Sequence, residues 1–192
     1  MINHKSESTS KIAYQNPANK ITNLANKITL ARILLIPIFV VVLLSDIKYR
    51  AIVAASVFAI ISISDFFDGY VARKRNEVTA VGTMLDPLAD KLLISAALVF
   101  LIGRGVVAWM AYVIIAREFL ITGLRMLAAV KNTSIPVKMS GKIKTTVQMI
   151  AVGAVILSLP YSNVAMLIAT ILTIYSGLEY IWMGRSLLKG VF

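Results

Sequence analysis

Four aspartates lie within 26 positions of the sequence and are the residues best suited to chemistry. Asp65 and Asp68 are three residues apart, and Asp86 and Asp90 are four apart, so each pair shares one face if its segment is helical. Four carboxylates brought together repel one another unless cations neutralise them. Oxygen ligands without His or Cys suit Mg²⁺, Mn²⁺ or Ca²⁺, and two divalent ions would balance four carboxylates.

The carboxylates are the residues available for acid–base and metal chemistry, because the other residue types that usually do this chemistry are absent or nearly so. The chain has no Cys, and its single His, His4, lies in a polar N-terminal stretch. Disulfides, thiolate metal sites and a histidine base are therefore excluded. One structural alternative stays open, in which the aspartates are solvated loop carboxylates. They would then pair with the basic residues Arg73, Lys74, Arg75 and Lys91.

The aspartates lie at the ends of apolar segments that a bilayer could hold. Of the 192 residues, 58% are hydrophobic and 15% are charged, so we expect an integral membrane protein, because an average globular chain has about 25% charged residues. Ionisable residues in such segments are functional by default. Six apolar segments, near the ~20 residues that span a bilayer, follow the polar tail 1–25: they are 28–45, 51–72, 88–103, 106–130, 143–159 and 163–184. We therefore expect an all-α membrane domain, residues 26–192, with six transmembrane helices.

The basic residues predict how this domain is oriented. If the six helices alternate in direction, thirteen Lys and Arg residues fall on the side of the two termini and three fall on the other side. Basic residues mark the cytoplasmic side, so both termini and the four aspartates should lie at the cytoplasmic face. The net charge of +11 has the same explanation, and we expect no nucleic-acid partner. The chain size and the lack of a signal or transit peptide favour a prokaryotic plasma membrane.

Basic side chains in the fourth and fifth apolar segments could hold an anion. Arg117 and Arg125 are eight residues apart, which on a helix is ~12 Å of rise and about 80° of rotation, so both can border one pocket. Arginine also offers bidentate contacts to phosphate. Lys142 and Lys144 would point to nearly opposite sides of a helix, and we expect Lys142 in the pocket and Lys144 at lipid headgroups. Two alternatives remain: Arg125 could pair with Glu118, and Lys142 could be a cytoplasmic loop charge.

The acidic segment resembles the signature of the CDP-alcohol phosphotransferase family. That signature reads D-x2-D-G-x2-A-R-x8-G-x3-D-x3-D, and its eight defining positions all occur at the required spacing between Asp65 and Asp90. The resemblance implies a six-helix membrane enzyme that joins a CDP-linked lipid to an alcohol and releases CMP. It also implies two divalent metal ions, Mg²⁺ or Mn²⁺, which would bridge the pyrophosphate and stabilise the leaving CMP.

The same resemblance implies roles for individual residues. The implied metal ligands are Asp65, Asp68, Asp86 and Asp90. Asp90 would also take the proton from the attacking hydroxyl. The implied nucleotide-binding positions are Gly69, Ala72, Arg73 and, as a weaker candidate, Thr79.

Three further motifs resemble the phosphatidylglycerophosphate synthase branch of the family, whose acceptor is sn-glycerol 3-phosphate. They are A-R-E-F-x2-T-G-L-R at 116–125, G-K-I-K-T at 141–145 and S-G-x-E-Y at 176–180. By this resemblance, the residues that bind the acceptor phosphate are Arg117, Arg125 and Lys142. Asn26, Thr29 and Arg32 are similar to an N-x2-T-x2-R element near the lipid headgroup, although Ala25 replaces the usual proline. Glu179 has no implied role, and we expect it to pair with Arg185.

The expected function is transfer of the phosphatidyl group of CDP-diacylglycerol to sn-glycerol 3-phosphate, among membrane lipids. A homodimer is expected because homodimers are common in the family. No residue of this chain points to one. One alternative is a family member that uses serine, an inositol phosphate or phosphatidylglycerol as acceptor. Another alternative, of a different class, is a divalent-cation transporter whose carboxylates bind the permeating ion. The clustering of the aspartates near one membrane face argues against the transporter, because none is placed across the bilayer.

Overall fold

Six α-helices are present in the residues that the structure describes. The structure is a computed structural model, and it describes residues 24–75, 80–130, 133, 136 and 138–188. The helices are α1 (Leu24–Leu44), α2 (Arg50–Arg75), α3 (Ala80–Phe100), α4 (Ala108–Val130), α5 (Met139–Ile156) and α6 (Ser162–Leu188). The expectation of an all-α fold with six helices is therefore confirmed.

Several helices extend beyond the apolar segments from which they were expected. α3 begins at Ala80 and α5 begins at Met139, while α6 continues to Leu188. Hydropathy marks where the chain becomes polar, whereas a helix continues as long as its backbone hydrogen bonds do. As a result, Asp86 lies inside α3, and Gly141 and Lys142 lie inside α5 rather than in a loop.

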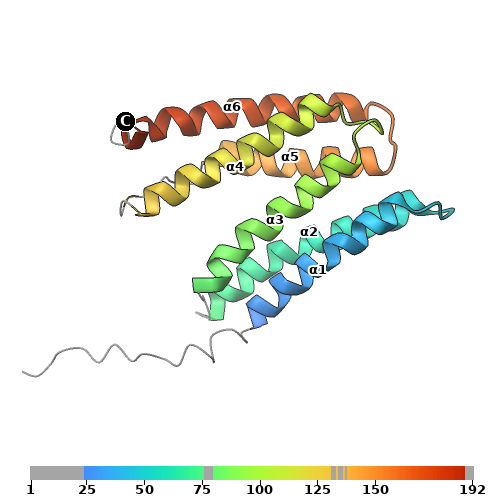
Figure 1. Cartoon of the computed structure of the whole chain (residues 1–192), viewed down its shortest axis with the longest axis horizontal. Helices are drawn as coiled ribbons and strands as arrows, with labels where there is room; N and C mark the ends of the chain where they lie inside the picture. The colour runs from blue at the N-terminus through green and yellow to red at the C-terminus, as the bar shows by residue number, and fades with distance from the viewer. Residues whose placement is uncertain (1–23, 76–79, 131–132, 134–135, 137, 189–192) are drawn as a thin grey trace, which may run out of the picture.

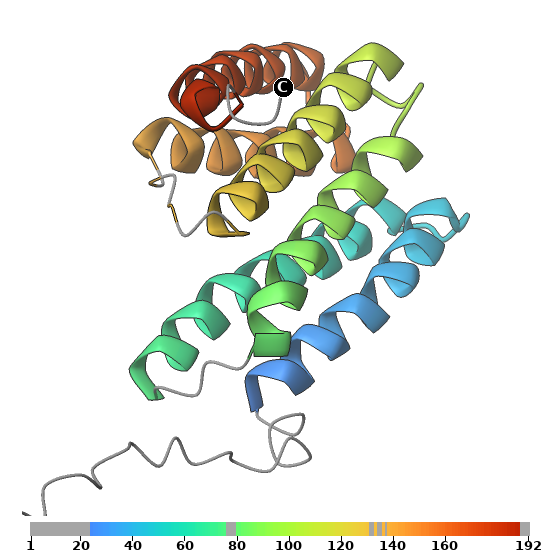
Figure 2. The ribbon, with the colours of Figure 1, turned by 60° about the vertical axis from the view of Figure 1, so that its left-hand side comes forward.

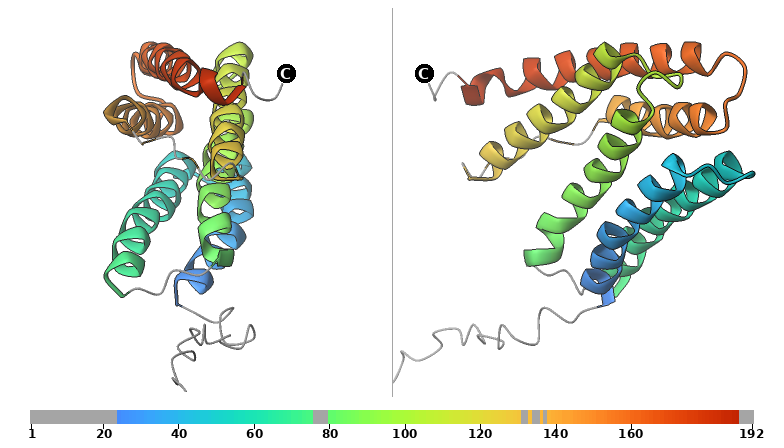
Figure 3. Two further views of the ribbon diagram at one scale, coloured as in Figure 1. Left: turned by 90° about the vertical axis from the view of Figure 1, so that its left-hand side faces the viewer. Right: turned by 45° about the vertical axis from the view of Figure 1, so that its right-hand side comes forward.

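The helices pack in two groups that share a common core. α1 packs against α2 and α3, and α6 packs against α4 and α5, while α2 contacts α5 and α3 contacts α4. Figures 2 and 3 show the two groups from three directions, with α3 leading directly into α4. The largest fully buried apolar side chains come from all six helices and include Phe39, Ile61, Leu98, Ile114, Val152 and Met166.

Different connections and helix termini lie at the two ends of the bundle. The connections α1–α2, α3–α4 and α5–α6 lie together at one end, to the right in Figure 1. The C-terminal ends of α2 and α4 and the N-terminal ends of α3 and α5 lie toward the other end. The α3–α4 turn is tight because Gly103 and Gly105 adopt φ values of +78° and +123°, which side chains disfavour. A Cβ on Gly105 would lie 3.0 Å from Cγ1 of Val155, so this turn also packs closely on the end of α5.

Much of the outer surface of the bundle is apolar. Large side chains exposed on several helices include Leu34, Val41, Ile52, Ile150 and Leu178. Among the described residues, one stretch, Ser162–Arg185 of α6, is long and apolar enough to cross a membrane. Shorter apolar helical stretches are Leu30–Leu44, Arg50–Ser64 and Lys91–Phe100. Soluble monomers rarely expose apolar surface so widely, and the all-helical fold is consistent with a membrane protein.

Candidate functional site

The four aspartates lie on two consecutive helices. Asp65 and Asp68 belong to α2, and Asp86 and Asp90 belong to α3. α2 and α3 also pack against each other. The helical spacing that was expected for the two pairs is therefore present in the backbone. The chain offers these helices no Cys, so the donor set is oxygen-only and fits a hard divalent cation such as Mg²⁺ or Mn²⁺.

Most residues expected to bind the CDP-lipid lie outside the part of the chain whose side chains the structure describes. Thr79 lies outside the described residues, and so do the side chains of the four aspartates and of Asn26, Thr29, Gly69, Ala72 and Arg73. Their roles stay predictions. Arg32 is described, and its side chain is buried on α1 with 3% exposure. A buried arginine in an apolar helix is costly unless it serves a partner or a ligand, which keeps Arg32 a functional candidate.

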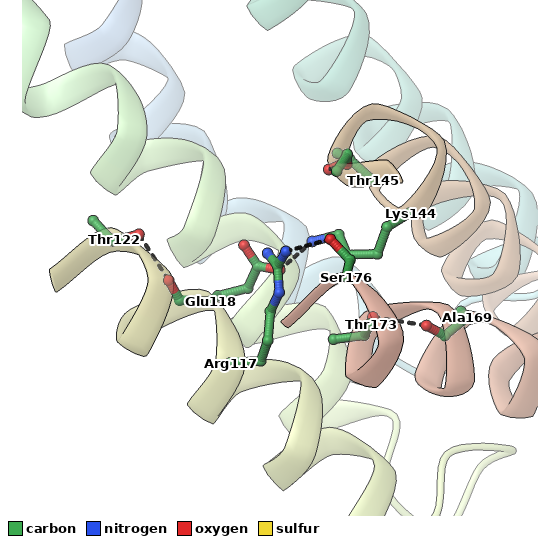
Figure 4. Close-up of polar contacts among 9 residues, drawn as sticks. Arg117, Glu118, Thr122, Lys144, Thr145, Ala169, Thr173 and Ser176 are labelled. Carbon is green, nitrogen blue, oxygen red and sulfur yellow. Dashed lines mark hydrogen bonds and ion pairs between the residues drawn. The ribbon is translucent and has the colours of Figure 1, made fainter. Parts of the chain in front are cut away.

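A polar cluster joins α4, α5 and α6 in the largely apolar interior. Lys144 on α5 donates to the carboxylate of Glu118 on α4, and Arg117 Nη1 lies 3.4 Å from the same Glu118 oxygen. Arg117 Nη2 also donates to Ser176 Oγ on α6 at 2.7 Å. Figure 4 shows the side chains of Arg117 and Glu118 turning toward Lys144 and Ser176. The side chains of Arg117, Glu118 and Lys144 are 12%, 15% and 3% exposed, so all three charges are withdrawn from solvent.

A small cavity of about 20 Å³ adjoins this cluster. Its lining residues are Lys91, Ile94, Glu118, Lys144, Thr145 and Gln148. Lys91 follows Asp90 directly in α3, so the cavity lies beside the segment that carries the expected base. Within the described part of the chain, the buried atoms Gln148 Oε1 and Arg117 Nε have no hydrogen-bond partner. A cavity of this size can hold a water molecule. Gln148 lines it and offers an acceptor there, whereas Arg117 is not among its lining residues.

The residues expected to bind the acceptor phosphate do not all come together. Arg117 belongs to the buried cluster, whereas Arg125 and Lys142 are exposed on α4 and α5. The expectation that Lys144 lies at lipid headgroups is wrong, because its side chain is buried against Glu118. The two lysines do point in different directions, as their spacing predicted.

One alternative pairing and one expected ion pair are also replaced by others. Glu118 bonds Lys144 and Arg117 rather than Arg125. Glu179 does not pair with Arg185, because it bonds Lys138 Nζ and Ser140 Oγ, each at 2.5 Å. The guanidinium of Arg185 instead lies 4.8 Å from the ring centre of Trp182. In both cases a partner from another helix is nearer than one on the same helix.

Sequence reasoning missed Lys144 and Gln148 as interior residues, although the pattern of α5 contains the signal. Residues 144, 148, 151, 152 and 155 recur at helical spacing, and all five are buried. The polar residues 144 and 148 continue the apolar stripe toward the start of the helix. Lys142 lies about 200° around the helix from Lys144, so extending the stripe would have identified the buried lysine.

Comparison with known proteins agrees with these motifs. The family model for CDP-alcohol phosphatidyltransferases matches residues 22–175. A CDP-diacylglycerol–glycerol-3-phosphate 3-phosphatidyltransferase of Bacillus subtilis (strain 168) is 45% identical, over 82% of this chain and 93% of the relative. Proteins of the same name from Rickettsia bellii (strain RML369-C) and Salmonella typhimurium are 40% and 37% identical, over 82% and 85% of this chain and 93% and 96% of the relatives. The match covers all six helices at least in part, and the chain belongs to the CDP-alcohol phosphatidyltransferase family.

Proposed function

We propose that this protein transfers the phosphatidyl group of CDP-diacylglycerol to sn-glycerol 3-phosphate, giving phosphatidylglycerophosphate and CMP. Family membership supports the use of a CDP-linked substrate, and the names of the relatives support glycerol 3-phosphate as acceptor. One structural observation carries the choice of acceptor. A buried cationic cluster on α4 and α5 adjoins the α3 segment that contains Asp90.

The charge of this cluster suits a phosphorylated acceptor. The described side chains Lys91, Arg117 and Lys144 carry three positive charges, and Glu118 carries one negative charge. Positive charges therefore outnumber negative charges among these described side chains, which favours an anionic acceptor. Charge-assisted hydrogen bonds are strongest where water is excluded, so a phosphorylated acceptor would gain more from these cations than a neutral acceptor such as serine.

Within the acceptor site, Arg117 is the residue that we assign first. Its Nε–H is buried and has no hydrogen-bond partner among the described residues, so this donor can serve a phosphate oxygen. The burial of Lys144 supports it over Lys142 as the lysine of the site. Lys142 and Arg125, both exposed, would then guide the anion toward the site by their charge.

The acidic helices would supply the reaction centre. Asp65, Asp68, Asp86 and Asp90 are proposed to hold two divalent ions, Mg²⁺ or Mn²⁺, which when bound would polarise the attacked phosphorus and stabilise the leaving phosphate. Asp90 is proposed to orient the acceptor hydroxyl and to accept its proton as the new phosphorus–oxygen bond forms and the bond to CMP breaks. The proton thus leaves the hydroxyl for the Asp90 carboxylate, and CMP departs with the electron pair.

The CDP-lipid is proposed to lie against α1 and α2. Gly69 and Ala72 would let the nucleotide approach the helix backbone closely, with Arg73 and Thr79 beside it. Asn26, Thr29 and Arg32 would contact the lipid headgroup. The burial of Arg32 on a helix that packs against α2 and α3 supports this assignment.

The membrane arrangement belongs to the same proposal. All six helices would cross a plasma membrane, with both termini and the reaction centre at the cytoplasmic face. The apolar outer surface of the bundle supports insertion in lipid, and the excess of basic residues on the side of the termini supports the orientation. A homodimer remains a prediction from the family.

The test is CMP release by purified full-length protein in detergent, from CDP-diacylglycerol with Mg²⁺ or Mn²⁺. The acceptors are sn-glycerol 3-phosphate, serine, an inositol phosphate and phosphatidylglycerol, each with and without EDTA. We expect EDTA-sensitive release with glycerol 3-phosphate alone. Release with a different acceptor would retain the reaction and reject the acceptor assignment. No release from folded protein, together with ion flux in liposomes, would favour a divalent-cation transporter.

A further inference from the structure

One turn of α6 makes most of the contacts that fix Arg117. Ser176 is fully buried, and its hydroxyl accepts a hydrogen bond from Arg117 Nη2 at 2.7 Å. The ring centre of Tyr180, one turn further along α6, lies 5.6 Å from Arg117 Cζ. A ring and a hydroxyl at this spacing share one face of the helix. The guanidinium is therefore held by a hydrogen bond and by an aromatic ring at the same time.

Gly177 lies between these two residues and makes room for the arginine. A Cβ at position 177 would lie 3.0 Å from Arg117 Cγ and 3.7 Å from Arg117 Nε. The nearer atom is close to the root of the side chain, so Arg117 could not yield by moving its tip alone. Any substitution would push the whole side chain away from α6, and the guanidinium at its end would move furthest.

The same turn also contacts and hydrogen-bonds the start of α5, the helix that carries Lys144. The Tyr180 hydroxyl accepts a hydrogen bond from the backbone N–H of Lys138 at 2.9 Å. A Cβ on Gly141 would lie 3.3 Å from that hydroxyl, so α5 begins in close contact with the ring. Glu179 adds bonds to the side chains of Lys138 and Ser140. The turn of residues 176–180 thus contacts both Arg117 and the helix of Lys144.

We propose that residues 176–180 of α6 act as a positioning element that sets the location of the Arg117 guanidinium and so the affinity for the acceptor phosphate. This inference rests on the proposed function. Ser176, Gly177 and Tyr180 act through Arg117 and Lys144, and they are positioning residues. A flexible arginine in this place would have to lose side-chain entropy each time the acceptor bound, whereas the fixed one has already lost it.

The first experiment compares Gly177→Ala with Gly153→Ala in the purified full-length protein. A Cβ on Gly153 of α5 meets no atom within 4 Å, so this control adds the same methyl group without touching Arg117. We expect Gly177→Ala to raise the KM for sn-glycerol 3-phosphate about tenfold, with the KM for CDP-diacylglycerol and the Tm near wild type. Gly153→Ala should leave both KM values unchanged. An unchanged glycerol 3-phosphate KM in Gly177→Ala, or an equal rise for both substrates with a lower Tm, overturns the proposal.

The second experiment is a double-mutant cycle. It tests the same proposal without relying on Gly177→Ala, and it becomes the deciding experiment in the event that this variant does not fold. Ser176→Ala should raise the KM for glycerol 3-phosphate about fivefold in the wild-type background, because it removes a hydrogen bond to a charged group. Lysine at position 117 cannot make the same planar contacts, so in Arg117→Lys the Ser176→Ala change should alter KM less than about twofold. Ser176→Thr, which keeps the hydroxyl, should restore the KM. Equal effects of Ser176→Ala in both backgrounds overturn the proposal.

The wild-type protein distinguishes a failure of this inference from a failure of the proposed function. If the wild type releases no CMP on addition of glycerol 3-phosphate, the proposed function is rejected. If the wild type does so and the α6 variants match it, only the positioning element is rejected.

Discussion

The ammonium group of Lys144 on α5 donates to the carboxylate of Glu118 on α4, and Arg117 approaches the same carboxylate oxygen at 3.4 Å. One carboxylate therefore serves two cations that come from neighbouring helices. This arrangement offsets part of the cost of burying the cations. The cluster thus holds a carboxylate and two cations within reach of one another in the interior.

The two lysines of the G-K-I-K-T motif should differ in function. Lys144 is buried in the cluster, whereas Lys142 is exposed on the other side of α5. We expect Lys144→Met to raise the KM for sn-glycerol 3-phosphate about tenfold or more, since it removes a charged donor, and Lys142→Met to change it less than about threefold. Steady-state CMP release at varied acceptor concentration measures both. The reverse order of effects would return the acceptor site to Lys142.

Glu118 should be required for stability. Glu118→Gln removes the counter-charge of a lysine whose side chain is 3% exposed. Removing one partner of a buried ion pair costs about 3–5 kcal/mol, so we expect a markedly lower Tm in detergent. The double variant Glu118→Gln with Lys144→Met should recover much of the loss, because the buried lysine is then removed as well. A single variant that unfolds at the wild-type temperature would contradict the structural role of the pair.

The fold could be read from the sequence because a bilayer limits the choices. Apolar segments of this length must form helices, since every backbone polar group has to be satisfied within the segment. The ends of the helices were harder to predict, as α3 and α5 show. Polar residues can continue a helix, and hydropathy gives no signal for them. The acidic motif was equally accessible, since its eight fixed positions lie within a single stretch of chain.

The partners of the basic and acidic side chains could not be read in this way. Glu118 was weighed against Arg125 on its own helix, and Glu179 against Arg185, because sequence spacing reveals only neighbours on the same helix. The actual partners are Lys144 of α5 and Lys138, which directly precedes α5. Which helices face each other depends on packing across the whole bundle. Tertiary contacts of this kind leave only a weak trace in a single sequence, such as the buried stripe that runs through Lys144.

Asp90 should be essential for turnover, unlike an acidic residue away from the reaction centre. Asp90→Asn removes the carboxylate that is proposed to accept the hydroxyl proton, so we expect CMP release to fall by at least about 100-fold. Asp46→Asn, in the exposed connection between α1 and α2, makes the same chemical change and should keep wild-type activity. Near-wild-type turnover of Asp90→Asn, at unchanged metal and substrate concentrations, would remove Asp90 from the base role.

The hydroxyl of Tyr180 should contribute to stability through α5. Lys138 at the start of α5 has no side-chain cap, and its N–H donates to Tyr180 instead. Tyr180→Phe keeps the ring beside Arg117 and removes this acceptor, at a cost of about 1 kcal/mol. For a chain of this size the Tm should fall by about 2–4 °C. Tyr175→Phe, which alters an exposed tyrosine of the same helix, is the matched control and should not change the Tm.

The six-span arrangement can be tested by cysteine labelling, because the chain contains no native cysteine. Thr133 follows α4, and Asp46 lies between α1 and α2, and both are exposed. If all six helices span the membrane with cytoplasmic termini, a membrane-impermeant maleimide should label Thr133→Cys only in inside-out vesicles. The same reagent should label Asp46→Cys only in right-side-out vesicles.

The labelling result bears on the mechanism as well as on the topology. The N-terminal end of α3 lies toward the same end of the bundle as the end of α4, and Asp86 belongs to the N-terminal half of α3 with Asp90 at its midpoint. Labelling of Thr133→Cys from the cytoplasmic side would thus indicate that the N-terminal end of α3 lies at the cytoplasmic face. A soluble glycerol phosphate reaches the protein from that face. Labelling of both variants in the same vesicle orientation would reject the alternation of the helices, because residues 46 and 133 would then share one side. Labelling of Thr133→Cys from the outside alone would invert the orientation predicted by the basic residues.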